Sequence, residues 1–123
     1  MSKNANYPVY NFSIIDGHFT DLIFNLNIER HSHLFWEIAV TLKGDYVNSF
    51  DSGDIPLKSC CLTIIRPSDV HFVKIKGTPA MYRDIYVSDE KMRQMANVIR
   101  EGLYDELLNS PTPSVCVINK AHL

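Results

Sequence analysis

The chain has 123 residues, of which 46% are hydrophobic and 21% charged, and its formal net charge is −2 at pH 7. These values are typical of one folded domain with a hydrophobic core. Nucleic-acid binding by this chain alone is disfavoured, because such binding depends on clustered Lys and Arg side chains. No apolar run approaches the roughly 20 residues of a membrane helix, and we expect no membrane partner and a cytoplasmic location.

Short apolar-rich segments, separated by turn residues, occupy the chain up to residue 87. This spacing of strands and turns is typical of a sandwich or barrel, so we predict a mainly β fold. Gly53 in the turn 51–54 supplies the positive φ that a hairpin needs. The predicted strands cover residues 9–15, 21–29, 31–43, 46–50, 56–65, 71–76 and 81–87.

The pattern changes to helix after Ser88, which can cap a helix N-terminus. The residues Met92, Met95, Ala96 and Ile99 follow the spacing of an amphipathic helix. Gly102 interrupts this pattern, residues 104–108 predict a second short helical turn, and residues 115–118 predict an extended segment. We expect the apolar stripe of the helix to pack on the barrel and to form part of an interface between two copies.

The segment 31–43 carries the most informative motif, because three metal-ligating residue types recur at odd positions. In a strand, side chains alternate between two faces, so His31, His33, Phe35 and Glu37 share one face. A helix would place the two histidines about 200° apart, where they cannot share a site. The opposite face is apolar and includes Trp36, which we assign to the core or an interface. This segment therefore predicts a barrel wall with polar side chains inside.

A third histidine, His71, follows the turn Pro67-Ser68-Asp69. It begins a strand in which His71, Val73 and Ile75 share one face. Together, three imidazoles and the carboxylate of Glu37 would suit a divalent transition metal such as Zn, Ni, Fe or Mn. The alternative for the same residues is a hydrogen-bonding cluster that holds ligand hydroxyl groups.

The two segments resemble the two motifs of the cupin superfamily, whose ligand histidines and glutamate line one end of a small barrel. The second motif is shortened, because Pro67 and His71 are four residues apart and Asp69 stands where a glycine is expected. In this form it resembles the N-terminal sensor domain of AraC/XylS-type transcription regulators, especially those of chitobiose and cellobiose operons. The resemblance covers roughly residues 20–100.

The resemblance implies a cupin barrel, a double-stranded β-helix or jelly roll, over residues 1–88. Residues 89–123 would then form a helical segment leading toward a DNA-binding domain outside this chain. It further implies a homodimer that contacts DNA only through that absent domain, has no enzymatic activity and responds to a sugar.

A small saccharide would bind in the barrel through an aromatic face and fixed polar groups. The side chains that we predict for this role are Phe35, Glu37, His71 and Arg83, the last of which lies inward if Ile85 and Val87 do. The metal-site prediction comprises His31, His33, Glu37 and His71.

Two functions stay open at this point. The leading one is the ligand-sensing and dimerisation domain of a sugar-responsive regulator, which the shortened motif and the helix favour. The alternative is a small stand-alone metal-dependent cupin enzyme, such as a dioxygenase, isomerase or epimerase, which the complete ligand set favours.

Overall fold

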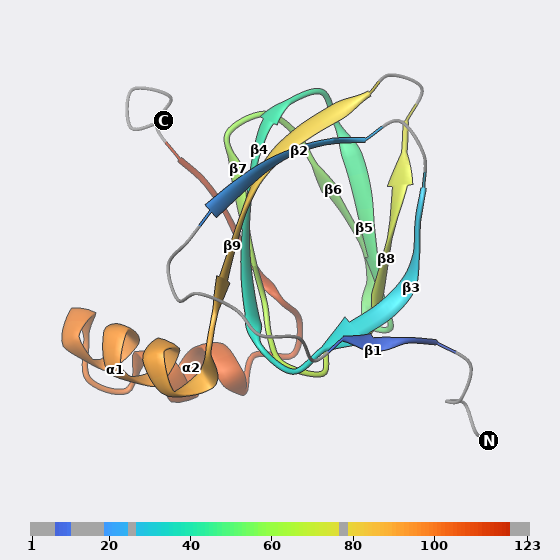
Figure 1. Ribbon diagram of the computed structural model, residues 1–123. Helices are drawn as coiled ribbons and strands as arrows, with labels where there is room; N and C mark the ends of the chain where they lie inside the picture. Colours follow the sequence, from blue (N-terminus) through green and yellow to red (C-terminus); the bar gives the residue numbers. More distant parts are fainter. Residues whose placement is uncertain (1–6, 11–18, 25–26, 77–78, 119–123) are drawn as a thin grey trace.

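The computed structural model describes residues 7–10, 19–24, 27–76 and 79–118. Two five-stranded sheets face each other across a barrel (Figure 1). This arrangement confirms the predicted mainly β architecture followed by helix. In spatial order the first sheet contains β1 (Val9–Tyr10), β3 (Ile28–His33), β8 (His71–Ile75), β5 (Tyr46–Phe50) and β6 (Gly53–Leu57). The second sheet contains β10 (Ser114–Val117), β7 (Cys61–Ile65), β4 (Trp36–Lys43), β9 (Ala80–Val87) and β2 (Phe19–Phe24).

The predicted strand 31–43 is in fact two strands that belong to opposite sheets. Strand β3 ends at His33 in the first sheet, and β4 begins at Trp36 in the second. The chain crosses between the walls at Leu34 and Phe35, where the Leu34 side chain is half-exposed. The alternation of faces survives the crossing, because two residues are one full period of a strand. The motif therefore serves both walls of the barrel.

Two other predicted strands are divided in the same way. The segment 56–65 turns after Leu57, and Cys60 adopts a φ of 70° in the turn that leads into β7. The segment 21–29 is divided between β2 and β3. The sequence between these pairs of strands lacks Gly and Pro, the strongest sequence markers of a turn. Of the predicted strand 9–15, residues 11–15 lie outside the described residues.

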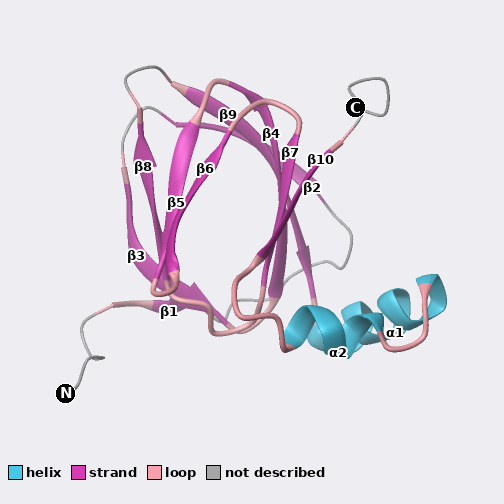
Figure 2. Ribbon diagram, turned by 180° about the vertical axis from the view of Figure 1, so that it is seen from behind, coloured by secondary structure: helices cyan, strands magenta, loops and turns pink. Residues whose placement is uncertain are grey.

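The helices form where the sequence predicts them. Helix α1 (Asp89–Ile99) begins after Ser88, whose side chain accepts a hydrogen bond from the Lys91 N–H at 3.3 Å. Gly102, with a φ of 86°, separates it from α2 (Leu103–Leu108). Both helices lie beside one end of the second sheet (Figure 2). No helix in the described ranges has both the length and the apolarity needed to cross a membrane.

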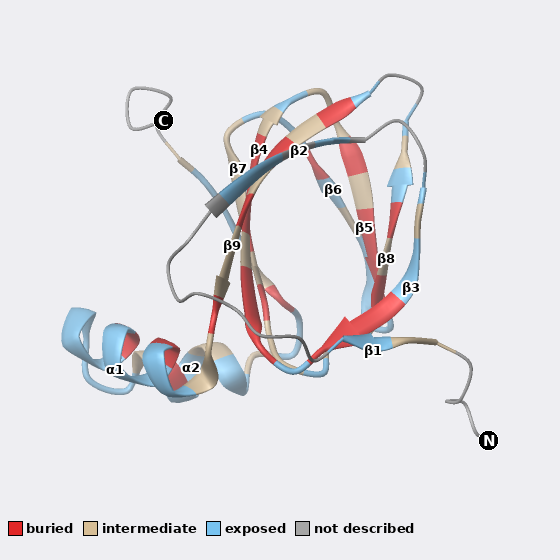
Figure 3. Ribbon diagram, in the orientation of Figure 1, coloured by how far each residue is buried: buried red, intermediate tan, exposed pale blue. Residues whose placement is uncertain are grey.

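The helices pack against the outer face of the second sheet near one of its ends. Trp36 is fully buried there in a cluster with Val87, Met92, Ala96 and Tyr104. The indole N–H of Trp36 donates to Asp89 Oδ1 at 2.8 Å, which ties the sheet to the first turn of α1. Figure 3 shows buried residues in both helices and in the strands of the barrel beside them.

Only part of the predicted apolar stripe packs on the barrel. Met92 and Ala96 are buried, but Met95 is 37% exposed and Ile99 is 76% exposed. Helix α1 contacts the sheet along a narrow face near its first turns, so the residues at its far end remain outside the core.

Candidate metal centre

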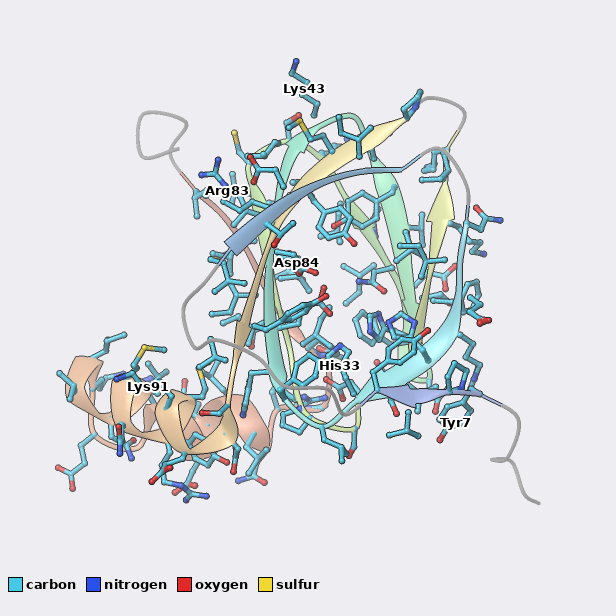
Figure 4. All side chains as sticks on the ribbon, viewed as in Figure 1. Tyr7, His33, Lys43, Arg83, Asp84 and Lys91 are labelled. Carbon is cyan, nitrogen blue, oxygen red and sulfur yellow. The ribbon has the colours of Figure 1, made fainter. Side chains whose placement is uncertain are left out.

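A cavity of about 350 Å³ lies between the two sheets. The first sheet contributes three histidines to it: His31 and His33 on β3, and His71 on β8, which pairs directly with His31. Figure 4 shows His33 inside the barrel, toward the end where β1 lies. The other lining residues are Tyr10, Ile28, Phe35, Glu37, Tyr46, Asn48, Val73, Tyr82, Asp84 and Tyr86.

The three histidines form a compact cluster. One ring nitrogen from each lies within 4.8 Å of the others, and all three side chains are buried. The Nδ1 atom of each ring is hydrogen-bonded to an oxygen that can only accept, so Nδ1 carries the proton and Nε2 keeps a lone pair. The acceptors are the Glu29 carbonyl for His31 at 2.7 Å, the Phe35 carbonyl for His33 at 2.9 Å, and Asn48 Oδ1 for His71 at 2.9 Å.

Burial keeps the cluster neutral. It lowers the pKa of His31 and of His33 below the usual value. The pKa of His71 falls to about 2, first because of burial and then because of the two neighbouring histidines. A neutral imidazole is the form that coordinates a metal.

The fit of a metal can be tested on His71. Among the residues that the structure describes, its Nε2 is one of the few buried side-chain nitrogen and oxygen atoms without a hydrogen-bond partner. Leaving such an atom unpaired is unfavourable, and a divalent ion held by the three Nε2 atoms would satisfy it. Fixed Nδ1–H groups are also what orient histidine ligands in metal sites. The residues present therefore fit a three-histidine metal site with open coordination positions.

Glu37 lies beside this cluster and contacts one of its members. Its Oε1 is 2.8 Å from His33 Nε2. Because Nδ1 of His33 donates to the Phe35 carbonyl, Nε2 accepts here and the Glu37 carboxyl supplies the proton. Burial raises the pKa of Glu37, which favours this protonated form. The structure thus brings together His31, His33 and His71, while the role of Glu37 as a fourth ligand stays a prediction.

Phe35 lies where the strand pattern predicts, on the cavity wall. Its ring stacks on His33 with centroids 4.8 Å apart and planes 4° from parallel. It also meets Tyr86 of the second sheet, with centroids 4.8 Å apart. Its role in binding a ligand ring stays a prediction.

Arg83 does not lie in the cavity, and its predicted inward orientation is wrong. Its guanidinium forms an ion pair with Asp21 of β2 at 2.7 Å on the outside of the barrel (Figure 4). The neighbouring Ile85 faces the helices. The outer face of this strand is apolar where the helices cover it, and that apolarity was mistaken for a core-facing pattern.

The second sheet instead presents Asp84, which the sequence pattern missed. Asp84 is 2% exposed and lines the cavity between Tyr82 and Tyr86 on the inner face of β9. Burial, and then the nearby Glu37, raises the pKa of Asp84 well above its ordinary value. Burial also raises the pKa values of the hydroxyls of Tyr46, Tyr82 and Tyr86. A weak signal was available: Asp84 is the one acid in the predicted strand 81–87.

Comparison with solved structures identifies the fold. A cupin-2 domain protein from Shewanella frigidimarina has a TM-score of 0.54 and 17% identity, over 60% of this chain and 72% of that chain. A predicted oxalate decarboxylase from Thermotoga maritima gives 0.53 and 19%, over 57% and 64% of the two chains. The Bacillus subtilis oxalate decarboxylase, which has Mn(II) centres, gives 0.52 and 13%, over 74% of this chain and 30% of that chain. The chain therefore has the cupin fold. No family model and no curated protein matches the sequence.

These neighbours correct one expectation. We expected a domain without enzymatic activity, as the resemblance to regulators implied. The neighbours named above include an oxalate decarboxylase, a cupin enzyme, and this finding contradicts that expectation. The comparisons lend no support to the regulator family or to a chitobiose operon, whereas the cupin fold that the resemblance implied is confirmed.

Proposed function

We propose that the chain is a metal-dependent cupin enzyme that acts on a small molecule in the barrel. The observation that carries this proposal is a cluster of three buried histidines whose Nδ1–H groups are fixed by hydrogen bonds and which each offer a ring nitrogen within 4.8 Å of the others. The unpartnered Nε2 of His71 supports it, as far as the described chain extends.

His31, His33 and His71 would hold the ion, and a set of imidazoles suits Mn, Fe, Ni or Zn. When bound, such an ion supplies a Lewis acid that polarises an oxygen of the substrate. The Mn(II) centres of the Bacillus subtilis neighbour make manganese the first metal to test.

Glu37 is the residue that we propose to move a proton. Its carboxyl already shares a proton with His33 across 2.8 Å, and it lines the cavity. The lone pair of His33 that accepts this bond is the one that a metal ligand needs, so in the loaded protein Glu37 must exchange this contact for another. A carboxyl group at this position can then act as general acid or base toward the bound molecule.

The aromatic side chains of the cavity wall would exclude water and position the substrate. Phe35 and Tyr86 pack against each other where the two sheets meet. A reaction that requires proton delivery to a polarised substrate, such as decarboxylation or isomerisation, fits these parts best.

The experiment combines metal analysis with a screen for turnover. The protein is loaded separately with Mn, Fe, Ni and Zn, its metal content is measured, and each form is tested against small carboxylates and monosaccharides. We expect one metal per chain and turnover that Glu37→Gln lowers by about 100-fold or more, within the usual range for a general acid or base. Failure of all four metals to bind would contradict the proposal, as would equal turnover by the Glu37 variant.

A further inference from the structure

The inner face of β9 holds a buried acid that the proposed proton transfer does not use. Asp84 is 2% exposed and lines the cavity opposite the histidine-bearing sheet. In the part of the chain that the structure describes, neither of its carboxyl oxygens has a hydrogen-bond partner. The Glu37 carboxyl and the Tyr86 hydroxyl lie beside it, and their side-chain contacts with it shift its pKa.

Its neighbours across the sheet cannot satisfy it either. Asp84 is in register with Ala39 on β4, whose methyl group has no hydrogen-bonding capacity. Ala39 is in turn in register with Thr63 on β7, whose Oγ1 is also buried without a partner among the described residues. Burying a carboxyl in the wall of a largely apolar cavity is unfavourable, so a ligand that completes its hydrogen bonding would explain its presence here.

We infer that Asp84 is a specificity-determining residue that binds a hydroxyl group of the substrate. This inference rests on the proposed function, since the same molecule must also reach the three-histidine site. A hydroxyl group suits the carboxyl in both protonation states, because it can donate to the ionised form and accept from the neutral form. An ammonium group would suit the ionised form alone.

The cavity indicates the size and kind of this substrate. A volume of about 350 Å³ lies near the lower end of ligand pockets and suits a molecule the size of a monosaccharide. Its aromatic walls, including Phe35 and Tyr86, offer flat apolar surface to the C–H face of a ring. The combination of an aromatic wall and a buried carboxyl points to a monosaccharide or a polyol of similar size.

The test compares wild type with Asp84→Asn, which keeps the volume, and with Thr63→Val as a matched control. Thr63 is buried on the same inner row, yet it is not among the residues that line the cavity. Manganese-loaded proteins are titrated by calorimetry with a panel of aldoses, ketoses, polyols and amino sugars, and with the monodeoxy counterparts of the panel members. We expect Asp84→Asn to weaken binding at least tenfold and Thr63→Val to change it less than twofold, with metal content unchanged in both. One monodeoxy counterpart should bind the wild type and Asp84→Asn equally.

A stability measurement separates recognition from a structural role. If Asp84 serves a ligand and not the fold, Asp84→Asn should leave the thermal midpoint of the sugar-free protein close to that of the wild type, because both side chains have nearly the same volume and the fold does not depend on the carboxyl. A lower midpoint would indicate a structural role and would overturn the inference.

The outcomes distinguish this inference from the proposed function. If the wild type holds manganese but binds no panel member, or if Asp84→Asn binds equally well, the inference fails and the metal site stands. If only amino sugars bind, the hydroxyl assignment is overturned. If no metal binds, the proposed function fails, while sugar binding that is lost in Asp84→Asn would still support the role of Asp84.

Discussion

The two sheets of the barrel face the same cavity with opposite chemistry. The first sheet supplies bases, the three histidines, and the second supplies acids, Glu37 and Asp84. Burial lowers the pKa values of the histidines and raises those of the carboxyls. Both walls therefore disfavour charge, because an ion without a partner is unstable in a low-dielectric interior. The cavity is thus suited to a charged or polar ligand that can pair with the polar groups of both sheets.

The two walls differ in how their polar atoms are held. On the first sheet each histidine Nδ1 has an acceptor within 2.9 Å, so the rings are fixed before any ligand arrives. On the second sheet, the oxygens of Asp84 have no such partner within the described residues. We interpret the first wall as preorganised for a metal and the second as completed by a substrate.

The largest expected effect comes from removing a base from the first wall. His33→Ala should reduce metal content from stoichiometric to background, because the two remaining histidines cannot hold a divalent ion against competing ligands. Elemental analysis after dialysis measures this loss. The companion variant Glu37→Gln should retain its metal if Glu37 serves as proton donor, and should lose it if Glu37 is a ligand. Stoichiometric metal in His33→Ala would show that the site lies elsewhere.

A smaller loss of metal binding is expected when the hydrogen-bond partner of His71 is removed. Asn48→Ala removes the acceptor that fixes the His71 ring at 2.9 Å. Losing such an orienting contact lowers metal affinity about 10- to 100-fold, which competition with a chelator can measure. Ser49→Ala is the control, since the Ser49 hydroxyl bonds Asp54 rather than a histidine. Equal affinities for the two variants would refute a preorganised first wall.

Acid should destabilise the metal-free protein through His71. Its pKa falls from 6.5 to about 2 on folding, so below pH 6.5 the unfolded chain binds a proton that the folded chain does not. Stability from this group is fully present above pH 6.5, and it declines by about 2 kcal/mol between pH 7 and pH 5. Because the raised pKa values of Glu37 and Asp84 act in the opposite direction, the comparison must be between wild type and a variant.

Chemical denaturation with a chelator present, at several pH values, provides this measurement. The difference in unfolding free energy between wild type and His71→Gln should shrink as the pH falls from 7 to 5. A difference that stays constant over this range would show that His71 is not held neutral by burial.

The smallest change in stability is expected from a substitution on the outside of the barrel, away from the cavity. Arg83→Ala breaks an ion pair with Asp21 in which each side chain is 32% exposed. Such partly exposed pairs contribute roughly 0–1 kcal/mol, and thermal denaturation should show a change within that range. Metal content and sugar binding should not change. A loss of binding would restore Arg83 to the site.

The sequence predicted the first wall better than the second. Alternation placed His31, His33 and Phe35 on one face, because a strand with an apolar outer side shows a clear period of two. Strand β9 lacks that contrast, since Ile85 and Val87 are covered by helices and Tyr82 and Tyr86 line the cavity. Both faces of β9 are therefore apolar or aromatic, and the pattern could not indicate that Asp84, rather than Arg83, points inward.

The crossing at Leu34 and Phe35 was also beyond the sequence pattern. Nothing in that dipeptide is a strong turn former, and the bend arises because two sheets must close around one cavity. The third histidine, His71, needed the family resemblance to be placed near the other two. Its direct pairing with His31 depends on strand order, which local spacing does not encode.

The crossing of the chain between the two sheets at Leu34 and Phe35 affects how the site can change in evolution. His33 and Glu37 are four residues apart, yet they belong to opposite walls and touch at 2.8 Å. This short segment sets the distance between His33, which we propose as a metal ligand, and the carboxyl of Glu37, and its length is independent of the loops at the far end of the barrel. Insertions elsewhere could reshape the cavity while this spacing is preserved. One residue inserted between positions 33 and 36 would turn Glu37 to the outer face of its sheet. The Glu37 carboxyl would then no longer contact the His33 imidazole.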